Sequence, residues 1–167
     1  MSAPERTLLI VWWSVTGASR ALAQAACEAA RESGECKVTM MSAPQATPAD
    51  LRAADGYLFV MPEMLGSMAG QMKDLFDRSY YDLQGAVEGR PYALIVCAGS
   101  DGTGAVRQLE RIVTGWRLRR IADARIVCTH AQTPEAIAAP KVLPAEELEA
   151  AGETGRALAM GLAMGLW

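Results

Sequence analysis

The chain is short of aromatic residues and of net charge. Phe, Trp and Tyr make up 6% of its 167 residues, and the formal net charge is −3. A charge so close to balance gives no electrostatic basis for binding nucleic acid. The sequence also lacks an apolar run of about 18 residues or more, which predicts no membrane span. The first residues lack the basic and apolar stretches of a signal peptide, so we expect a cytoplasmic protein.

Residues that bind metals or form disulfides are also scarce. The four cysteines, Cys27, Cys36, Cys97 and Cys128, include no C-x-x-C pair, and His130 is the single histidine. This composition contains no metal-ligand motif, so we expect no metal site. Cys97 and Cys128 lie in apolar runs, where a thiol behaves as a small hydrophobic side chain, and we expect both in the core.

About half of the residues are apolar, which is enough to bury a substantial core. We expect one domain over residues 1–167, with residues 1–6 as a flexible N-terminus. Five segments that resemble strands alternate with five of helical pattern, and this alternation predicts an α/β fold: a parallel sheet with helices on both faces. The predicted strands are residues 7–12, 36–41, 56–61, 92–98 and 125–128.

The predicted helices follow from apolar spacing and end signals. They are residues 18–33; a short helix that opens at Thr47-Pro48; a helix with Met68, Met72, Leu75, Phe76 and Tyr80 on one face; a helix with Val106, Leu109, Val113 and Trp116 on one face; and a helix from about residue 145 to the end, with Leu148, Ala151, Gly155, Leu158, Leu162 and Leu166 buried. The connection 131–144 contains three prolines, and a lid, an oligomer contact and a plain loop all remain open for it.

The first strand leads into the loop Ser14-Val15-Thr16-Gly17-Ala18-Ser19. Ligands of parallel α/β sheets bind beyond the carboxyl ends of the strands. Unpaired N–H groups at a helix N-terminus, together with three hydroxyls, suit an anion, and Gly17 lets the backbone approach it closely. The same residues also suit simple helix capping, so this loop alone leaves both interpretations open.

Two further loops carry a family resemblance together with the first. S-x-T-G-x-S after an apolar strand resembles the FMN-phosphate loop of flavodoxins and their relatives. The segment from Met61 to Arg78 resembles the P-x-x-x-G-x-M-x-x-x-M/L-K segment of NAD(P)H-dependent FMN and quinone reductases. A third loop, residues 97–105, contains three glycines. G-x-G-x-x-G and G-x-x-x-x-G-K-[ST] are absent from the first loop, which disfavours dinucleotide-fold and P-loop interpretations.

The resemblance implies a flavodoxin-like, doubly wound five-stranded parallel sheet of order 2-1-3-4-5. It implies that the first loop binds the FMN phosphate and that the other two lie along the flavin ring. The residues that it assigns to cofactor binding are Ser14, Val15, Thr16, Gly17, Ala18 and Ser19; Pro62, Glu63, Met64, Leu65 and Gly66; and Ala98, Gly99, Ser100, Asp101 and Gly102. No catalytic side chain is expected, because the flavin supplies the reactivity.

The function that the resemblance implies is an FMN-dependent oxidoreductase with NADH or NADPH as co-substrate. It would pass electrons to a quinone, a flavin or a similar small-molecule acceptor, and it would form a homodimer or homotetramer. Two alternatives remain: a flavodoxin-type electron carrier and a flavin-free binding or regulatory domain. Carriers are usually strongly acidic and stack an aromatic side chain on the flavin. The small net charge, and the absence of aromatic residues from the second and third loops, favour a reductase.

Arg117, Arg119, Arg120 and His130 also remain open. The arginines either bind NADPH phosphates or an acidic partner, or they form a solvated helix end, where cations complement the dipole. His130 either donates a proton to a quinone or reduced flavin, or is a turn or surface residue. We favour the simpler interpretation in both cases.

Overall fold

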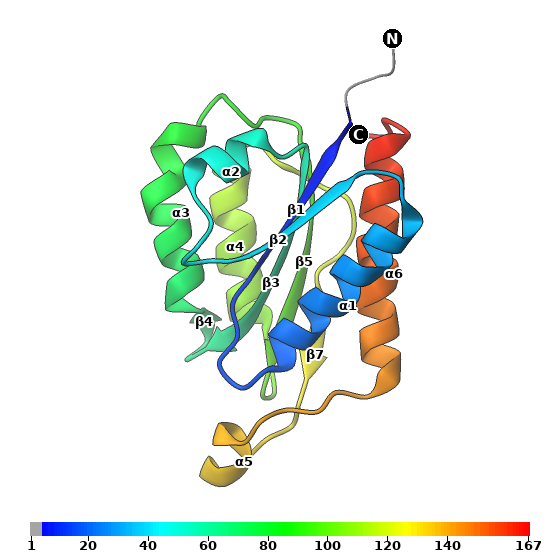
Figure 1. Ribbon diagram of the computed structural model, residues 1–167. Helices are drawn as coiled ribbons and strands as arrows, with labels where there is room; N and C mark the ends of the chain where they lie inside the picture. The colour runs from blue at the N-terminus through cyan, green and yellow to red at the C-terminus, as the bar shows by residue number, and fades with distance from the viewer. Residues whose placement is uncertain (1–4) are drawn as a thin grey trace.

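The central strands are apolar runs, and helices cover the sheet on both faces (Figure 1). The computed structural model describes residues 5–167. β1 (Thr7–Trp12), β3 (Gly56–Met64) and β5 (Pro91–Ala98) are mostly buried, whereas β2 (Lys37–Ser42) is a half-buried edge strand. Buried parallel strands read as continuous apolar runs, which is why the sequence pattern located these elements.

The main strands are parallel in the order β2-β1-β3-β5-β7, where β7 is Arg125–Cys128. The predicted order of five strands is therefore confirmed. A two-residue strand, β6 (Arg119–Arg120), pairs with the start of β5, and β7 pairs with its end.

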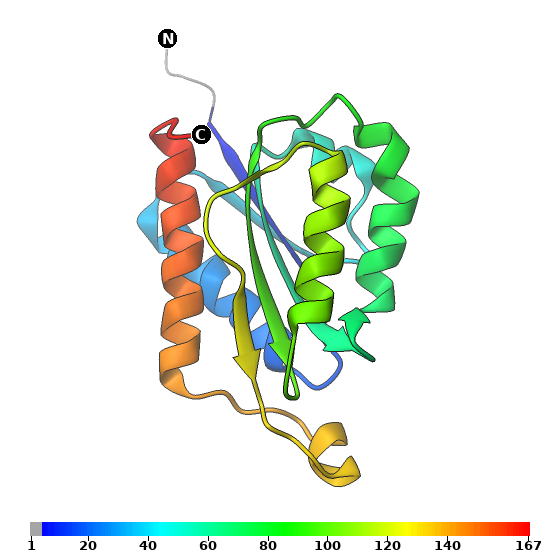
Figure 2. The ribbon, with the colours of Figure 1, turned by 180° about the vertical axis from the view of Figure 1, so that it is seen from behind.

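The helices divide between the two faces (Figures 1 and 2). α1 (Ala18–Ser33) and α6 (Ala145–Ala163) cover one face, and they pack against each other. α2 (Pro48–Ala53), α3 (Gly70–Leu83) and α4 (Thr103–Gly115) cover the other. Thr47 caps the start of α2 and Pro48 lies in its first turn, as the sequence signals predict. Asp50 completes a capping box with Thr47.

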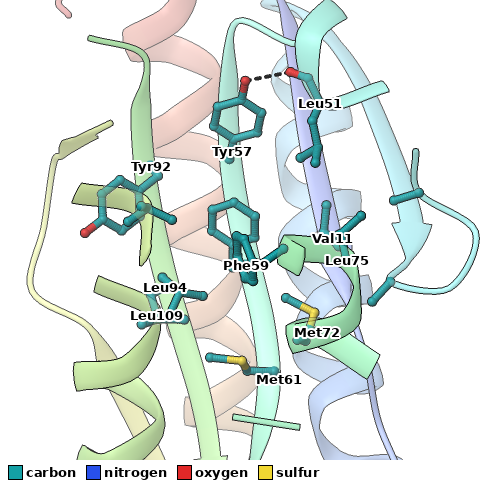
Figure 3. Packing of buried hydrophobic residues seen from close by; sticks show 14 of the residues in the cluster. Val11, Leu51, Tyr57, Phe59, Met61, Met72, Leu75, Tyr92, Leu94 and Leu109 are labelled. Carbon is teal, nitrogen blue, oxygen red and sulfur yellow. Dashed lines mark hydrogen bonds between the residues drawn. The ribbon is translucent and has the colours of Figure 1, made fainter. Parts of the chain in front are cut away.

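The buried aromatic residues gather on the face that α2, α3 and α4 cover (Figure 3). The ring centroids of Phe59 and Phe76 lie 5.4 Å apart, and those of Phe76 and Trp116 lie 5.3 Å apart. The Tyr57 hydroxyl donates to the Leu51 carbonyl at 2.6 Å, so its polar end is satisfied inside the core. Burial of such large side chains supplies much of the folding free energy of this face.

Several predicted elements differ from the structure. Met68 does not lie on the third helix but in β4 (Ser67–Met68), which pairs antiparallel with the end of β3. Leu65 and Gly66, at φ 52° and 75°, form the turn of this hairpin, and α3 begins only after it. The connection 131–144 contains an unpredicted helix, α5 (Pro134–Ala138).

The ends of the chain show smaller differences. α6 stops at Ala163, so Leu166 lies outside it and is exposed rather than buried. Cys97 is buried as expected, whereas Cys128 is only half-buried. Of the predicted flexible N-terminus, residues 1–4 lie outside the described residues, and Arg6 donates to the Asp55 carboxylate at 2.8 Å. Within residues 5–167, no helix has the length and hydropathy of a membrane span.

Gly155 tests the packing of α6 on α1. A Cβ atom at this position would lie 2.1 Å from the Ala26 carbonyl oxygen, a backbone atom that cannot move alone. We expect Gly155→Ala to lower the free energy of unfolding by about 1–3 kcal/mol, because the two helix backbones must separate. Urea unfolding followed by circular dichroism measures the change.

Gly152→Ala is the matched control on the same helix. Its Cβ would lie 3.3 Å from the Ala29 side chain, and alanine favours a helix over glycine by about 1 kcal/mol. Equal or greater stability is expected for this variant. A Gly155→Ala protein as stable as the wild type would contradict the close backbone packing.

Candidate functional site

A cavity of about 370 Å³ lies at the carboxyl ends of β1, β3, β5 and β7. The three predicted loops meet there with a fourth segment, the one that follows β7. The lining residues are Ser14, Val15, Thr16, Ala18, Ser19, Pro62, Glu63, Met64, Cys97, Ala98, Gly99, Thr129, Ala131, Ile137, Ala138 and Lys141.

The loop between β1 and α1 offers unpaired hydrogen-bond donors to the cavity. Gly17, at φ 96°, precedes the first residue of α1, and its N–H donates to the Ser14 hydroxyl at 3.0 Å. Within residues 5–167, the N–H groups of Ala18 and Ser19 have no acceptor, as expected in the first turn of a helix. Ser19 is 1% exposed, and its hydroxyl also has no partner among these residues. A buried polar atom without a partner is costly, so this loop is suited to a ligand that accepts hydrogen bonds.

Glu63 joins the second loop to the third. Its carboxylate accepts from the N–H groups of Gly102, at 3.0 Å, and Ala105, at 3.2 Å. It therefore caps the N-terminus of α4, where a negative charge is favourable. Gly104 lies so close to the hairpin that an added Cβ would be 2.0 Å from the Gly66 carbonyl oxygen. These contacts fix the two loops relative to each other.

The third loop contributes mainly backbone. Ala98 and Gly99 line the cavity, whereas Ser100 and Asp101 are exposed and do not. Asp101 instead accepts from the Thr103 hydroxyl, at 2.7 Å, and from the Thr103 N–H, and these hydrogen bonds lower the pKa of its carboxyl. Gly17, Leu65, Gly66 and Gly102 also lie outside the lining, although each shapes a turn that bears lining residues.

The predicted site residues include none from the segment after β7, although a lid was one of the roles left open for residues 131–144. Thr129, Ala131, Ile137, Ala138 and Lys141 all line the cavity. A threonine N-cap followed by proline does signal the start of α5 at Thr133, but no local pattern places that helix at the cavity. Lys141 is the single cationic residue of the lining.

Cys97 is the one thiol in the lining. Burial raises the pKa of Cys97 to about 11, so the thiol stays protonated near neutral pH. A protonated thiol is a poor nucleophile, and the side chain acts as apolar surface. Within residues 5–167, no three His, Cys, Asp or Glu side chains are grouped in a way that would hold a metal ion.

The arginine cluster and His130 do not line the cavity. Arg119 and Arg120 pair with the start of β5, whereas the cavity lies at its end. Arg117 pairs with Glu88 and Arg120 with Glu110. The cluster is therefore solvated, as the simpler interpretation expects, but only Arg117 lies near the end of α4, because Arg119 and Arg120 form β6. It lies at the opposite end of the strands from the cavity. The exposed His130 has φ 56°, and its N–H donates to the Gly99 carbonyl at 2.8 Å, as a turn residue.

The match to a known family covers about two thirds of the chain. Residues 23–132 match the NADPH-dependent FMN reductase family. The chain belongs to this family.

Two curated relatives agree with this assignment. The chain is 39% identical over 75 residues to a probable NAD(P)H dehydrogenase (quinone) FQR1-like 2 of Arabidopsis thaliana, which covers 44% of this chain and 27% of that protein. It is 30% identical over 97 residues to a flavodoxin of Aquifex aeolicus (strain VF5), which covers 58% and 50% respectively. The matches thus span about a quarter and a half of the length of these relatives.

Solved structures share the flavodoxin-like fold. An archaeal flavodoxin superposes with a TM-score of 0.74 at 15% identity, over 93% of this chain and 98% of its own. A flavodoxin, WrbA-like protein from Agrobacterium tumefaciens gives 0.71 at 16% identity, over 96% and 98%. At such identities the likeness shows the fold alone.

Glu63→Ala tests the link between the second and third loops. The variant leaves two N–H groups at the start of α4 without their acceptor, so we expect the free energy of unfolding to fall by about 1–2 kcal/mol. Urea unfolding again measures it. Glu149→Ala, an exposed glutamate on α6, is the control and is expected to change stability little. Equal stability of the two variants would rule out the capping role.

Proposed function

We propose that the cavity binds FMN and that the chain is an FMN-dependent NAD(P)H oxidoreductase. The observation that carries the proposal is the buried Ser19 hydroxyl, which has no partner in residues 5–167 and lies beside unpaired N–H groups at the start of α1. A phosphate oxygen is the acceptor that these donors suit, since helix N-termini favour anions. Family membership supports the same cofactor.

The phosphate subsite would consist of neutral donors. Ser14, Thr16 and Ser19 supply hydroxyls, and Ala18 and Ser19 supply N–H groups. The loop has no lysine or arginine, so the helix dipole and the hydrogen bonds would hold the charge. Ligand binding would also satisfy the Ser19 hydroxyl.

The walls of the cavity suit a flat ring. Pro62, Met64 and Ala98 present apolar surface from the second and third loops, and Ile137 presents it from α5. The flavin, when bound, supplies the hydride chemistry, while the protein positions the ring and forms hydrogen bonds to it. The Glu63 carboxylate is engaged at α4, so we assign it a positioning role rather than a role in proton transfer.

The acceptor that we propose is a quinone, a flavin or a similar small molecule. Trp, Tyr and Phe are absent from the lining, and the net charge is only −3, which together favour a reductase over a dedicated electron carrier. The name of the plant relative, an NAD(P)H dehydrogenase (quinone), supports a quinone. The expected homodimer or homotetramer stays a prediction.

FMN titration and turnover test the proposal directly. We expect apoprotein to quench FMN fluorescence at one flavin per chain, and the loaded protein to oxidise NADPH or NADH when a soluble benzoquinone is added. Absence of FMN binding would favour a flavin-free domain. FMN binding without nicotinamide oxidation, with or without quinone, would favour a carrier.

Ser19→Ala tests the phosphate subsite. Loss of a hydrogen bond to a charged group costs about 1.5–3 kcal/mol, so we expect the Kd for FMN to rise about tenfold or more. The Kd for riboflavin, which lacks the phosphate, should stay unchanged. Ser33→Ala, at the C-terminal end of the same helix and outside the lining, is the control and should bind FMN like the wild type. An equal loss for both flavins would place the phosphate elsewhere.

A further inference from the structure

We propose that Lys141 is a positioning residue that holds the α5 segment, residues 133–141, against the phosphate loop as a wall of the flavin cavity. The proposal rests on the proposed FMN site. It adds that cofactor affinity depends on Lys141, which is not among the site residues predicted from the sequence. Two observations support the proposal: Lys141 forms four hydrogen bonds, and α5 has no buried residues.

The α5 segment lacks the usual means of attachment. None of the residues of α5 is buried, and Ile137 is 56% exposed although it lines the cavity. A five-residue helix is too short to be stable by itself in water. Contacts other than core packing must therefore hold it at the cavity.

The Lys141 ammonium provides the first of these contacts. Its Nζ donates to the carbonyl oxygens of Ala136 at 2.7 Å, Ile137 at 2.9 Å and Ala139 at 2.6 Å. The last carbonyls of a helix lack N–H donors within it, and a cation is favoured at that end. The three donors of the ammonium are thus matched by three carbonyls, and the side chain closes the C-terminus of α5.

The Lys141 backbone provides the second contact. Its N–H donates to the Thr16 carbonyl in the loop between β1 and α1, at 2.8 Å. Within residues 5–167, this is the one hydrogen bond that joins residues 131–143 to the rest of the protein, and Leu143 adds partly buried packing. Lys141 therefore connects α5 to the phosphate loop, because its side chain bonds to α5 and its backbone N–H bonds to the loop.

This arrangement distinguishes positioning from direct charge pairing. The ammonium would have to leave its three carbonyls to reach a phosphate, and α5 would then lose its C-terminal contact. Lys141 therefore acts by fixing the wall that Ile137 and Ala138 present to the cavity. A wall contributes to binding of the flavin ring, so its loss should weaken FMN and riboflavin alike.

Lys141→Met tests the proposal with two readouts. We expect the Kd values for FMN and for riboflavin to rise by the same factor, about tenfold, because both ligands use the wall. We also expect faster amide hydrogen exchange over residues 131–144 in the ligand-free variant, measured by mass spectrometry. Lys141→Arg, which retains a cation and donors, should stay close to the wild type in both.

Lys73→Met is the matched control, since Lys73 pairs with Asp77 on α3 and does not line the cavity. It should change neither affinity nor exchange. Unchanged exchange in Lys141→Met overturns the proposal, and so does a loss of affinity confined to FMN, which would make Lys141 a counter-ion of the phosphate. If wild-type protein binds no FMN, the proposed function fails, whereas the exchange measurement still tests the attachment of α5.

Discussion

Burial of the sheet on both of its faces is the constraint on which the rest of the structure depends. A parallel sheet is covered on both faces because helices join its strands, so β1 and β5 are each followed by a helix that begins near the end of the strand. The unpaired N–H groups of α1 and α4 therefore collect at the same edge of the sheet. Glu63 caps the N–H groups of α4, whereas the N–H groups of α1, beside Ser19, lack an acceptor within residues 5–167. The candidate site is largely a consequence of this topology.

The two faces of the sheet are buried by different kinds of side chain. On one, large rings such as Phe59, Phe76 and Trp116 fill the space between sheet and helices. On the other, small residues let α6 approach α1 until Gly155 lies against the Ala26 backbone. This close packing fixes the axis of α1 and hence the direction in which its N-terminus meets the cavity. The packing of α6 on α1 thus bears on the geometry of the loop between β1 and α1.

The sequence patterns located elements whose signals are local. The bounds of β1, α1 and β7 follow from apolar runs, glycine stops and helical spacing, and the structure confirms them. The β3–β4 hairpin was missed because leucine has no local preference for the positive φ that Leu65 adopts. The partners of Glu63 lie 39 and 42 residues away, and Lys141 bonds to Thr16, so neither contact leaves a local pattern. Long-range hydrogen bonds, such as those of the Glu63 side chain and the Lys141 backbone, are what the local patterns could not predict.

The wall formed by α5 bears on the choice between a reductase and a carrier. A dedicated carrier keeps its flavin under a stacked aromatic ring, but no aromatic side chain lines this cavity. Its outer wall instead consists of exposed residues such as Ile137, which depend on the contacts of Lys141. A segment with few buried contacts opens at low free-energy cost. The four hydrogen bonds of Lys141 therefore oppose opening of this side of the cavity, and the lack of aromatic lining is the feature that favours the proposed reductase over a carrier.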